Sequence, residues 1–118
     1  MTNTNQVLQE VAKERLRQMK KWGVQSHPDG TGPDTYPLDI GLEGNFKDYN
    51  AYDLAREFTD HTDDVFSGED GTWTDILLEE VFEALAESDY DKLKAELIQV
   101  AAVAAAWVED IDNREVGL

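Results

Sequence analysis

An apolar segment near the C-terminal end places the strongest constraint on how this chain can fold. From Leu97 to Val108 the only polar residue is Gln99. A helix that is apolar on all sides is buried on more than one face, so this segment belongs between other helices or between subunits. Its longest apolar run, Val100 to Val108, has nine residues, whereas a helix needs about 20 to span a bilayer. A soluble protein with no membrane partner is therefore expected.

The rest of the sequence predicts helices as well. Residues 4–22 carry apolar side chains at helical spacing, at Leu8, Ala12, Leu16 and Met19. The same periodicity runs through residues 51–66 and from residue 72 onward, and the apolar C-terminal helix is expected from Ser88 to about Asn113. Residues whose side chains cap helices mark these starts: Thr4, Asp48 or Asn50, Thr72 with Asp75, and Ser88 with Asp91.

Residues 23–50 form the least regular part of the chain. Five glycines and three prolines lie between Gly23 and Gly44, a density that forbids a long helix or a central strand. A loop of this length in a compact domain is usually functional or mobile. His27 within it is interpreted either as a ligand contact or as a solvated side chain. We therefore predict one all-α domain over residues 1–118, a helical bundle of about four helices with a long irregular loop after the first.

The charge and the cysteine content exclude several classes of function. The chain has no cysteine, which rules out disulfides, zinc–thiolate sites and thiol catalysis. Residues 1–22 hold five basic and two acidic residues and so carry a charge of +3. Because the whole chain has a net charge of −16, the remaining residues carry −19. This acidity argues against nucleic acid as a partner. The polar N-terminus lacks the apolar core of a signal peptide, so we expect a cytoplasmic location.

Acidic residues recur at helical spacing in the last two predicted helices. Glu79, Glu80 and Glu83 lie on one helix, and Glu96 and Gln99 on the next. Two such faces turned toward each other would form a carboxylate cage, a site for a hard divalent cation such as Mg²⁺. A solvated acidic surface explains the first helix equally well. Glu96 and Gln99 favour a site, because they belong to an apolar helix and a buried carboxylate needs a partner or a metal.

The spacing of these residues resembles a known signature. EExxE at Glu79, Glu80 and Glu83, followed after twelve residues by ExxQ at Glu96 to Gln99, resembles the EExxE and ExxD motifs of MazG-type nucleoside triphosphate pyrophosphohydrolases. The segment RQMKKWGVQSHPDGT, at residues 17–31, is also similar to small MazG-like proteins. The resemblance implies a helical bundle, assembled as a homodimer or homotetramer, that needs Mg²⁺ and cleaves an NTP or dNTP to the monophosphate and pyrophosphate.

The same resemblance implies a role for each matching residue. Glu80, Glu83 and Glu96 match metal ligands of the family, and Glu79 matches a second ligand or a catalytic base that orients water. Gln99 stands where the family pattern has Asp. An amide oxygen can still ligate a metal, but it adds no charge and cannot act as a base.

Basic and aromatic residues at the end of the first predicted helix are candidates for substrate binding. Arg17, Lys20 and Lys21 can offset the charge of phosphates, and Trp22 or Trp73 can stack on a base. Each has a structural alternative. Cations in the last turn suit the helix dipole, and an aromatic ring beside an apolar stripe belongs to the core.

Two other functions are compatible with the sequence. A catalytically silent protein with this acidic surface would bind a basic partner. A nucleotide-binding sensor would keep the fold and bind NTP without cleaving it. Gln99 and the charge of −19 after residue 22 favour these alternatives.

Overall fold

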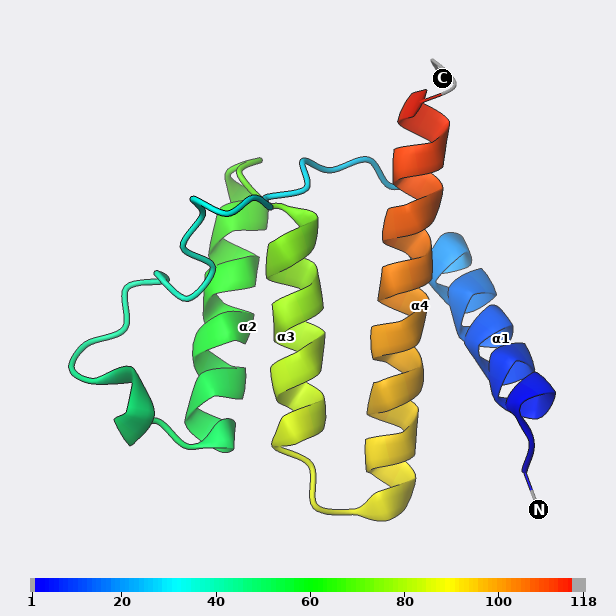
Figure 1. The fold of residues 1–118 in the computed structure, drawn as a ribbon, viewed down its shortest axis with the longest axis horizontal. Coiled ribbons are helices and arrows are strands. Elements are labelled where there is room, and N and C mark those ends of the chain that lie inside the picture. The colour runs from blue at the N-terminus through cyan, green and yellow to red at the C-terminus, as the bar shows by residue number, and fades with distance from the viewer. Residues whose placement is uncertain (1, 116–118) are drawn as a thin grey trace.

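The computed structural model of the chain describes residues 2–115, and all its regular elements over that range are helices (Figure 1). They are α1 (Thr4–Trp22), a short 3₁₀ helix η1 (Phe46–Asp48), α2 (Ala51–Ser67), α3 (Trp73–Leu85) and α4 (Tyr90–Glu115). The predicted all-α class, the four helices and the long irregular loop after the first helix are therefore confirmed. Within the described residues, no helix is long and apolar enough to cross a membrane.

Polar side chains begin the helices, although two of the predicted caps are wrong. Thr72 with Asp75 begins α3 as predicted, and Asn50 begins α2. Asn3, not Thr4, caps α1, because Gln6 lies three residues beyond it and completes the reciprocal pair of bonds. At the start of α4, Asp89 replaces Ser88.

The geometry of the α3–α4 turn explains this second correction. The backbone N–H groups of Ser88 and Asp89 both donate to Glu87 Oε1, which holds Ser88 in the turn. Asp89 Oδ2 then accepts from the backbone N–H of Lys92 at 3.0 Å. The first helical residue is therefore Tyr90.

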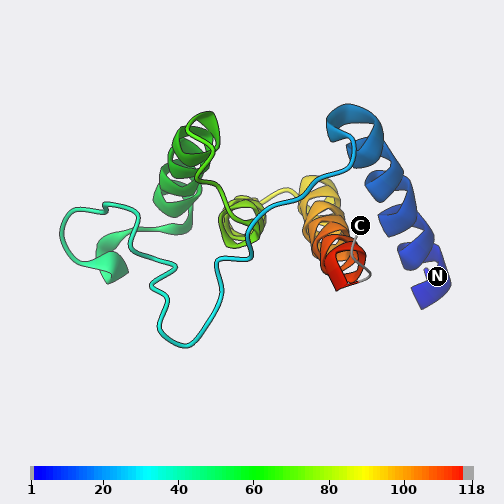
Figure 2. The ribbon, with the colours of Figure 1, turned by 90° about the horizontal axis from the view of Figure 1, so that it is seen from above.

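The four helices lie in one row rather than around a common centre. Along this row α2 packs on α3, α3 on α4, and α4 on α1. Seen from above, the row bends into an open arc (Figure 2). The Cα radius of gyration is 15.3 Å, compared with about 13.5 Å for a closed domain of this length. The bundle is therefore open, with fewer positions enclosed on all sides.

Two aromatic contacts mark where the helices pack most tightly. Between α2 and α3, the rings of Phe58 and Phe82 stack with centroids 4.7 Å apart. Between α3 and α4, Trp73 stacks on Trp107 at 6.2 Å. The buried apolar core is small and consists of Leu54, Phe58, Trp73, Ala84, Ala102, Val103 and Ala106.

Part of the apolar stripe predicted for the first helix, and part of the apolar segment from Leu97 to Val108, are exposed in the chain. Leu8 and Leu16 of α1 are 57% and 63% exposed, and Leu97 and Val108 of α4 are 52% and 56% exposed. The opposite face of α4 supplies the core instead, because the small side chains of Ala102 and Ala106 let neighbouring helices approach closely there.

The segment 26–30 ties the loop to the α3–α4 pair. The backbone N–H of Trp73 donates to Pro28 O at 2.9 Å, and Trp107 Nε1 donates to Asp29 Oδ1 at 2.7 Å. The His27 ring meets the Phe66 and Trp73 rings edge-on, so this side chain is partly buried and not solvated. The loop therefore begins as a fixed strap over one end of the two helices.

Buried Asp110 anchors this strap from α4. Its Oδ2 accepts from Trp73 Nε1 at 2.8 Å and from the backbone N–H of His27 at 3.1 Å. Burial acts to raise its pKa, but these hydrogen bonds and the charge of Arg114 outweigh burial and hold the pKa below its usual range. The carboxylate therefore remains ionised and continues to accept both hydrogen bonds at neutral pH.

We expect Gly30→Ala to lower the free energy of unfolding by more than Gly41→Ala. Both glycines have a left-handed backbone, with φ of +74° and +82°, so each substitution incurs a strain of about 1–2 kcal/mol. Only at Gly30 would the new Cβ also lie 2.6 Å from Thr72 Oγ1, whereas at Gly41 it meets nothing within 4 Å. Urea unfolding of the two variants measures the difference. Equal destabilisation of the two variants would show that Gly30 is not in close contact with Thr72 at the start of α3.

Candidate functional site

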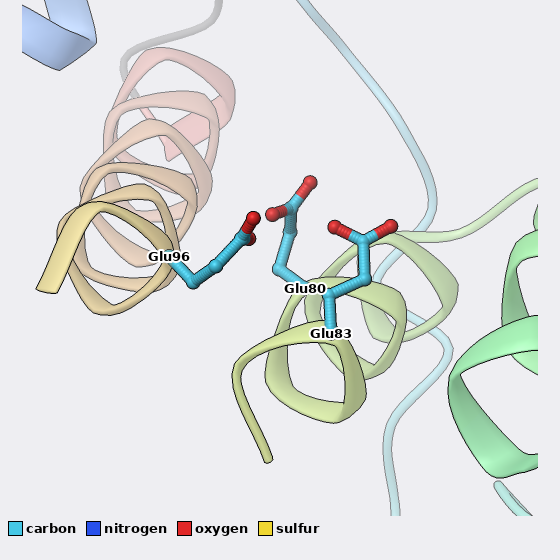
Figure 3. Close-up of side chains that lie close together, drawn as sticks. All are labelled: Glu80, Glu83 and Glu96. Carbon is cyan, nitrogen blue, oxygen red and sulfur yellow. The ribbon is translucent and has the colours of Figure 1, made fainter. Parts of the chain in front are cut away.

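Three glutamates from α3 and α4 converge at the centre of the helical row. Glu80, Glu83 and Glu96 each place a carboxylate oxygen within 4.8 Å of the others. Figure 3 shows Glu96 extending from α4 toward the two carboxylates of α3. Glu80 and Glu83 share a face because they are three residues apart, and the short turn after α3 brings Glu96 opposite them.

Partial burial of the cluster makes its negative charge costly. Burial, followed by the neighbouring charges of Glu83, Glu79, Glu96 and Glu14 in that order, raises the pKa of Glu80 to about 8. Burial and then the charge of Glu83 also raise the pKa of Glu96. Glu80 Oε2 and Glu96 Oε2 are buried and have no hydrogen-bond partner among the described residues. Protons or a cation would relieve this arrangement.

Glu79 lies beside the three-carboxylate cluster, on the side of α2. Burial, followed by the charge of Glu83, raises its pKa to about 7, and a hydrogen bond with Thr62 opposes that rise. Thr59 Oγ1 donates to Glu83 Oε1 at 3.4 Å, so α2 contacts this edge of the site through two threonines. Glu79 is therefore in a different environment from the three converging glutamates.

Gln99 follows Glu96 by three residues on α4 and is partly buried. Residues at this spacing share a helix side, so the amide lies on the side of α4 that carries Glu96. The sequence prediction that Gln99 occupies a ligand position stays a prediction.

A cavity of about 560 Å³ adjoins Glu79 and Glu80, a volume within the range of about 300–1,000 Å³ typical of small-molecule sites. One part of its wall is acidic and another is aromatic. The residues that line it are Gln18, Trp22, Val24, Gln25, Ser26, His27, Thr62, Asp63, Phe66, Trp73, Ile76, Glu79, Glu80, Val103 and Ala106. The cavity is thus shaped from α1, the strap, α2, α3 and α4.

The predicted substrate-binding residues occupy different positions around the cavity. Trp22 lines it, and Lys21 Nζ lies 4.8 Å from the centre of the Trp22 ring. Arg17 instead pairs with Glu14, and Lys20 is exposed. Trp73 is almost fully buried, so its alternative as a core residue is confirmed.

Glu14 is a residue near the site that sequence reasoning missed. It is the one charged residue among the described parts of α1 whose side chain is buried, with 7% exposure, and its charge contributes to the raised pKa of Glu80. Glu14, Gln18 and Trp22 recur every four residues, and the latter two line the cavity. This spacing was the available signal, but a single glutamate on an amphipathic helix is usually a surface residue.

We expect the metal-free protein to lose stability as pH rises from 5.5 to 8.5. Glu79 and Glu80 have folded-state pKa values of about 7 and about 8, above the ordinary value of 4.5. A group whose pKa is raised by folding contributes its full stability when the pH is below its pKa in the unfolded protein. That contribution is lost as the pH rises through its pKa in the folded protein. Melting in EDTA across this range measures the loss.

Two variants serve as controls for this pH dependence. Glu80→Gln should lose less stability over the range because it cannot ionise. Glu57→Gln, on the exposed side of α2, should behave like the parent protein. A parent protein whose stability is constant or increasing between these pH values would contradict the expected burial of the cluster.

Comparisons with known proteins assign no family to this chain. No family model matches the chain. No curated protein and no solved structure matches it either. The MazG resemblance therefore rests on the two motifs and on residues 17–31, which cover the end of the first helix and the start of the loop, and the activity it implies is a proposal.

Proposed function

We propose that this protein is a Mg²⁺-dependent nucleoside triphosphate pyrophosphohydrolase. One observation carries the proposal: carboxylate oxygens of Glu80, Glu83 and Glu96 lie within 4.8 Å of one another, beside a cavity large enough for a small molecule. Oxygen-only ligands suit Mg²⁺, which usually shares its coordination with water and substrate phosphates. The buried oxygens of Glu80 and Glu96 that lack partners fit this use.

In this proposal four side chains surround the cation. Glu80, Glu83 and Glu96 hold the cation, and Gln99 supplies a neutral oxygen where the family motif has a carboxylate. When bound, Mg²⁺ supplies positive charge that stabilises the phosphate chain and polarises the phosphorus under attack. Its charge would also offset the burial and the mutual repulsion that together raise the pKa of Glu80.

Glu79 is the proposed general base. With a pKa of about 7 it is partly ionised at neutral pH and can accept a proton there. In the proposed step a water oxygen forms a bond to phosphorus, the bond from that phosphorus to the leaving pyrophosphate breaks, and the water proton passes to Glu79. The products are a nucleoside monophosphate and pyrophosphate.

The wall of the cavity offers groups for both parts of such a substrate. Its acidic residues Glu79 and Glu80 would hold the metal and the phosphates. Trp22 offers an exposed ring for stacking on a base. Lys20 and Lys21 lie in the last turn of α1, Lys21 beside this ring, and would offset phosphate charge. A cytoplasmic location is part of the same proposal.

We expect the purified protein to release pyrophosphate from at least one member of a panel of NTPs and dNTPs with Mg²⁺. Glu83→Gln should lower kcat/KM by about 100-fold, which is about 2.7 kcal/mol of transition-state stabilisation. Glu57→Gln, exposed on α2, is the matched control and should retain activity. If no nucleotide releases pyrophosphate and Glu83→Gln behaves like the parent, the enzyme proposal is wrong.

We expect Gln99→Asp to bind Mg²⁺ more tightly than the parent, by about tenfold or about 1.4 kcal/mol. The added carboxylate supplies charge beside Glu96, so the same variant should melt at a lower temperature in EDTA and at a higher one with saturating Mg²⁺. Calorimetric titration and melting measure the two effects. Unchanged Mg²⁺ affinity would place residue 99 outside the metal shell.

The net charge of −19 after residue 22 favours one other function, an acidic surface that binds a basic partner. Calorimetry separates the two proposals. A dispersed acidic surface gives weak Mg²⁺ binding that disappears with added salt, whereas a buried site keeps its affinity. A sensor would bind the metal and NTP and release no pyrophosphate.

A further inference from the structure

The side of α2 that packs on α3 carries two hydroxyl groups at the level of the glutamates. Thr59 and Thr62 lie three residues apart on α2, so both can face α3. Thr59 Oγ1 donates to Glu83 Oε1 at 3.4 Å, and Thr62 Oγ1 donates to the backbone carbonyl of Asp75 at 3.3 Å. The first of these bonds reaches one of the three converging carboxylates from a helix that lies outside the cluster.

Aromatic packing fixes the position of Thr59 against Glu83. The rings of Phe58 and Phe82 stack with their centroids 4.7 Å apart, and Phe58 is fully buried. Each ring belongs to the residue just before one partner of the hydrogen bond. A shift of α2 along α3 would therefore have to break the ring stack as well as the hydrogen bond. Thr59 is also β-branched, which restricts rotation of its side chain.

Glu83 differs from Glu80 and Glu96 in having this support. Glu80 Oε2 and Glu96 Oε2 are buried and have no hydrogen-bond partner among the described residues, whereas Glu83 Oε1 accepts from Thr59. Glu79 also borders Glu83, but a carboxyl group donates a hydrogen bond only when it carries a proton, while a hydroxyl group donates at any pH. Thr59 can therefore hold Glu83 when all the glutamates of the site are ionised.

The two oxygens of Glu83 have different surroundings. In Figure 3 one oxygen points toward Glu80 and the other points away from it. Glu83 contributes one oxygen to the group of ligand atoms that lie within 4.8 Å of one another. To give a cation both oxygens, the carboxylate would have to turn, and this rotation would draw Oε1 away from the Thr59 hydroxyl. The hydrogen bond from α2 therefore opposes binding through both oxygens.

Mg²⁺ and Ca²⁺ make different demands on a carboxylate. Mg²⁺ takes about six oxygens in a near-regular octahedron at about 2.0–2.1 Å, which suits carboxylates that each give one oxygen. Ca²⁺ takes about six to eight oxygens at about 2.3–2.6 Å and can bind both oxygens of one carboxylate. Three glutamates that each give one oxygen satisfy a smaller part of the Ca²⁺ shell than of the Mg²⁺ shell. A site in which Glu83 cannot turn therefore favours the smaller cation.

We propose that Thr59 is a positioning residue that restricts Glu83 to one cation-binding oxygen and thereby selects Mg²⁺ over Ca²⁺. This inference rests on the proposed function through its cation site at Glu80, Glu83 and Glu96, but it needs no cleavage of a nucleotide. Thr59 touches the ligand and not the cation. In this way α2 determines which cation the residues of α3 and α4 prefer.

Calorimetric titration of the full chain with Mg²⁺ alone and with Ca²⁺ alone tests the proposal. Thr59→Val keeps the shape of the side chain and removes the donor. It should raise the Kd for Mg²⁺ by about tenfold, the lower end of what the loss of a bond to a metal ligand costs. The Kd for Ca²⁺ should change by less than about threefold, because a Glu83 that is free to turn can give Ca²⁺ both oxygens.

Further variants serve as controls for this selectivity. Thr59→Ser restores the donor and should keep both Kd values within about twofold of the parent values. Thr59→Ala removes the hydroxyl without placing a methyl group beside Glu83, and it should lose selectivity as Thr59→Val does. Thr35→Val is the matched control, because the hydroxyl it removes bonds to Gly32 O within the exposed loop. It should bind both cations as the parent does.

The possible results separate this inference from the proposed enzymatic activity. Equal losses of Mg²⁺ and Ca²⁺ affinity in Thr59→Val, or parent affinities for both cations, would overturn the role of Thr59 even if the parent releases pyrophosphate. A selective loss of Mg²⁺ affinity supports that role even if no nucleotide is cleaved. A parent protein that binds neither cation overturns it as well. A substitution that only loosens α2 would lower the melting temperature in EDTA and leave the ratio of the two Kd values unchanged, which also contradicts the proposal.

Discussion

The contact between α3 and α4 supports the rest of the molecule, and its two halves act in opposite directions. At one end, Trp73 packs against Val103 and Ala106 and donates to the buried carboxylate of Asp110. Toward the other end, Glu80, Glu83 and Glu96 crowd their negative charges together. The apolar end therefore holds the two helices so close together that the negative charges at the acidic end repel one another. Burial and this crowding of charge together raise the pKa values of Glu79 and Glu80.

Local patterns in the sequence predict the helices and part of the candidate site. The capping pair Thr72 and Asp75 is local, and so is the spacing of Glu80 and Glu83, and the structure contains both. The position of Glu96 opposite them follows from a short turn between two helices, which leaves little choice of geometry. These features depend on residues that are near one another in the chain.

Features that depend on distant residues were not predicted. Helical periodicity marks Leu8 and Leu16 as apolar, but it does not say whether the covering surface belongs to the same chain. Glu14 and Asp110 are buried because α1 and the strap return to α4, and no local pattern encodes that return. The sequence left two interpretations of His27 for the same reason, because its aromatic neighbours Phe66 and Trp73 lie 39 and 46 residues further along the chain.

The single row of helices also limits how α1 is held. Among the described helices, α1 packs against α4 alone, yet it contributes Gln18 and Trp22 to the cavity wall. The shape of the cavity thus depends on one helix–helix contact, so a small tilt of α1 would widen or narrow the cavity and would also move the charge of Glu14 relative to Glu80. A ligand that bound in this cavity would therefore favour one orientation of α1, by the same coupling free energy by which that orientation changes the affinity for the ligand.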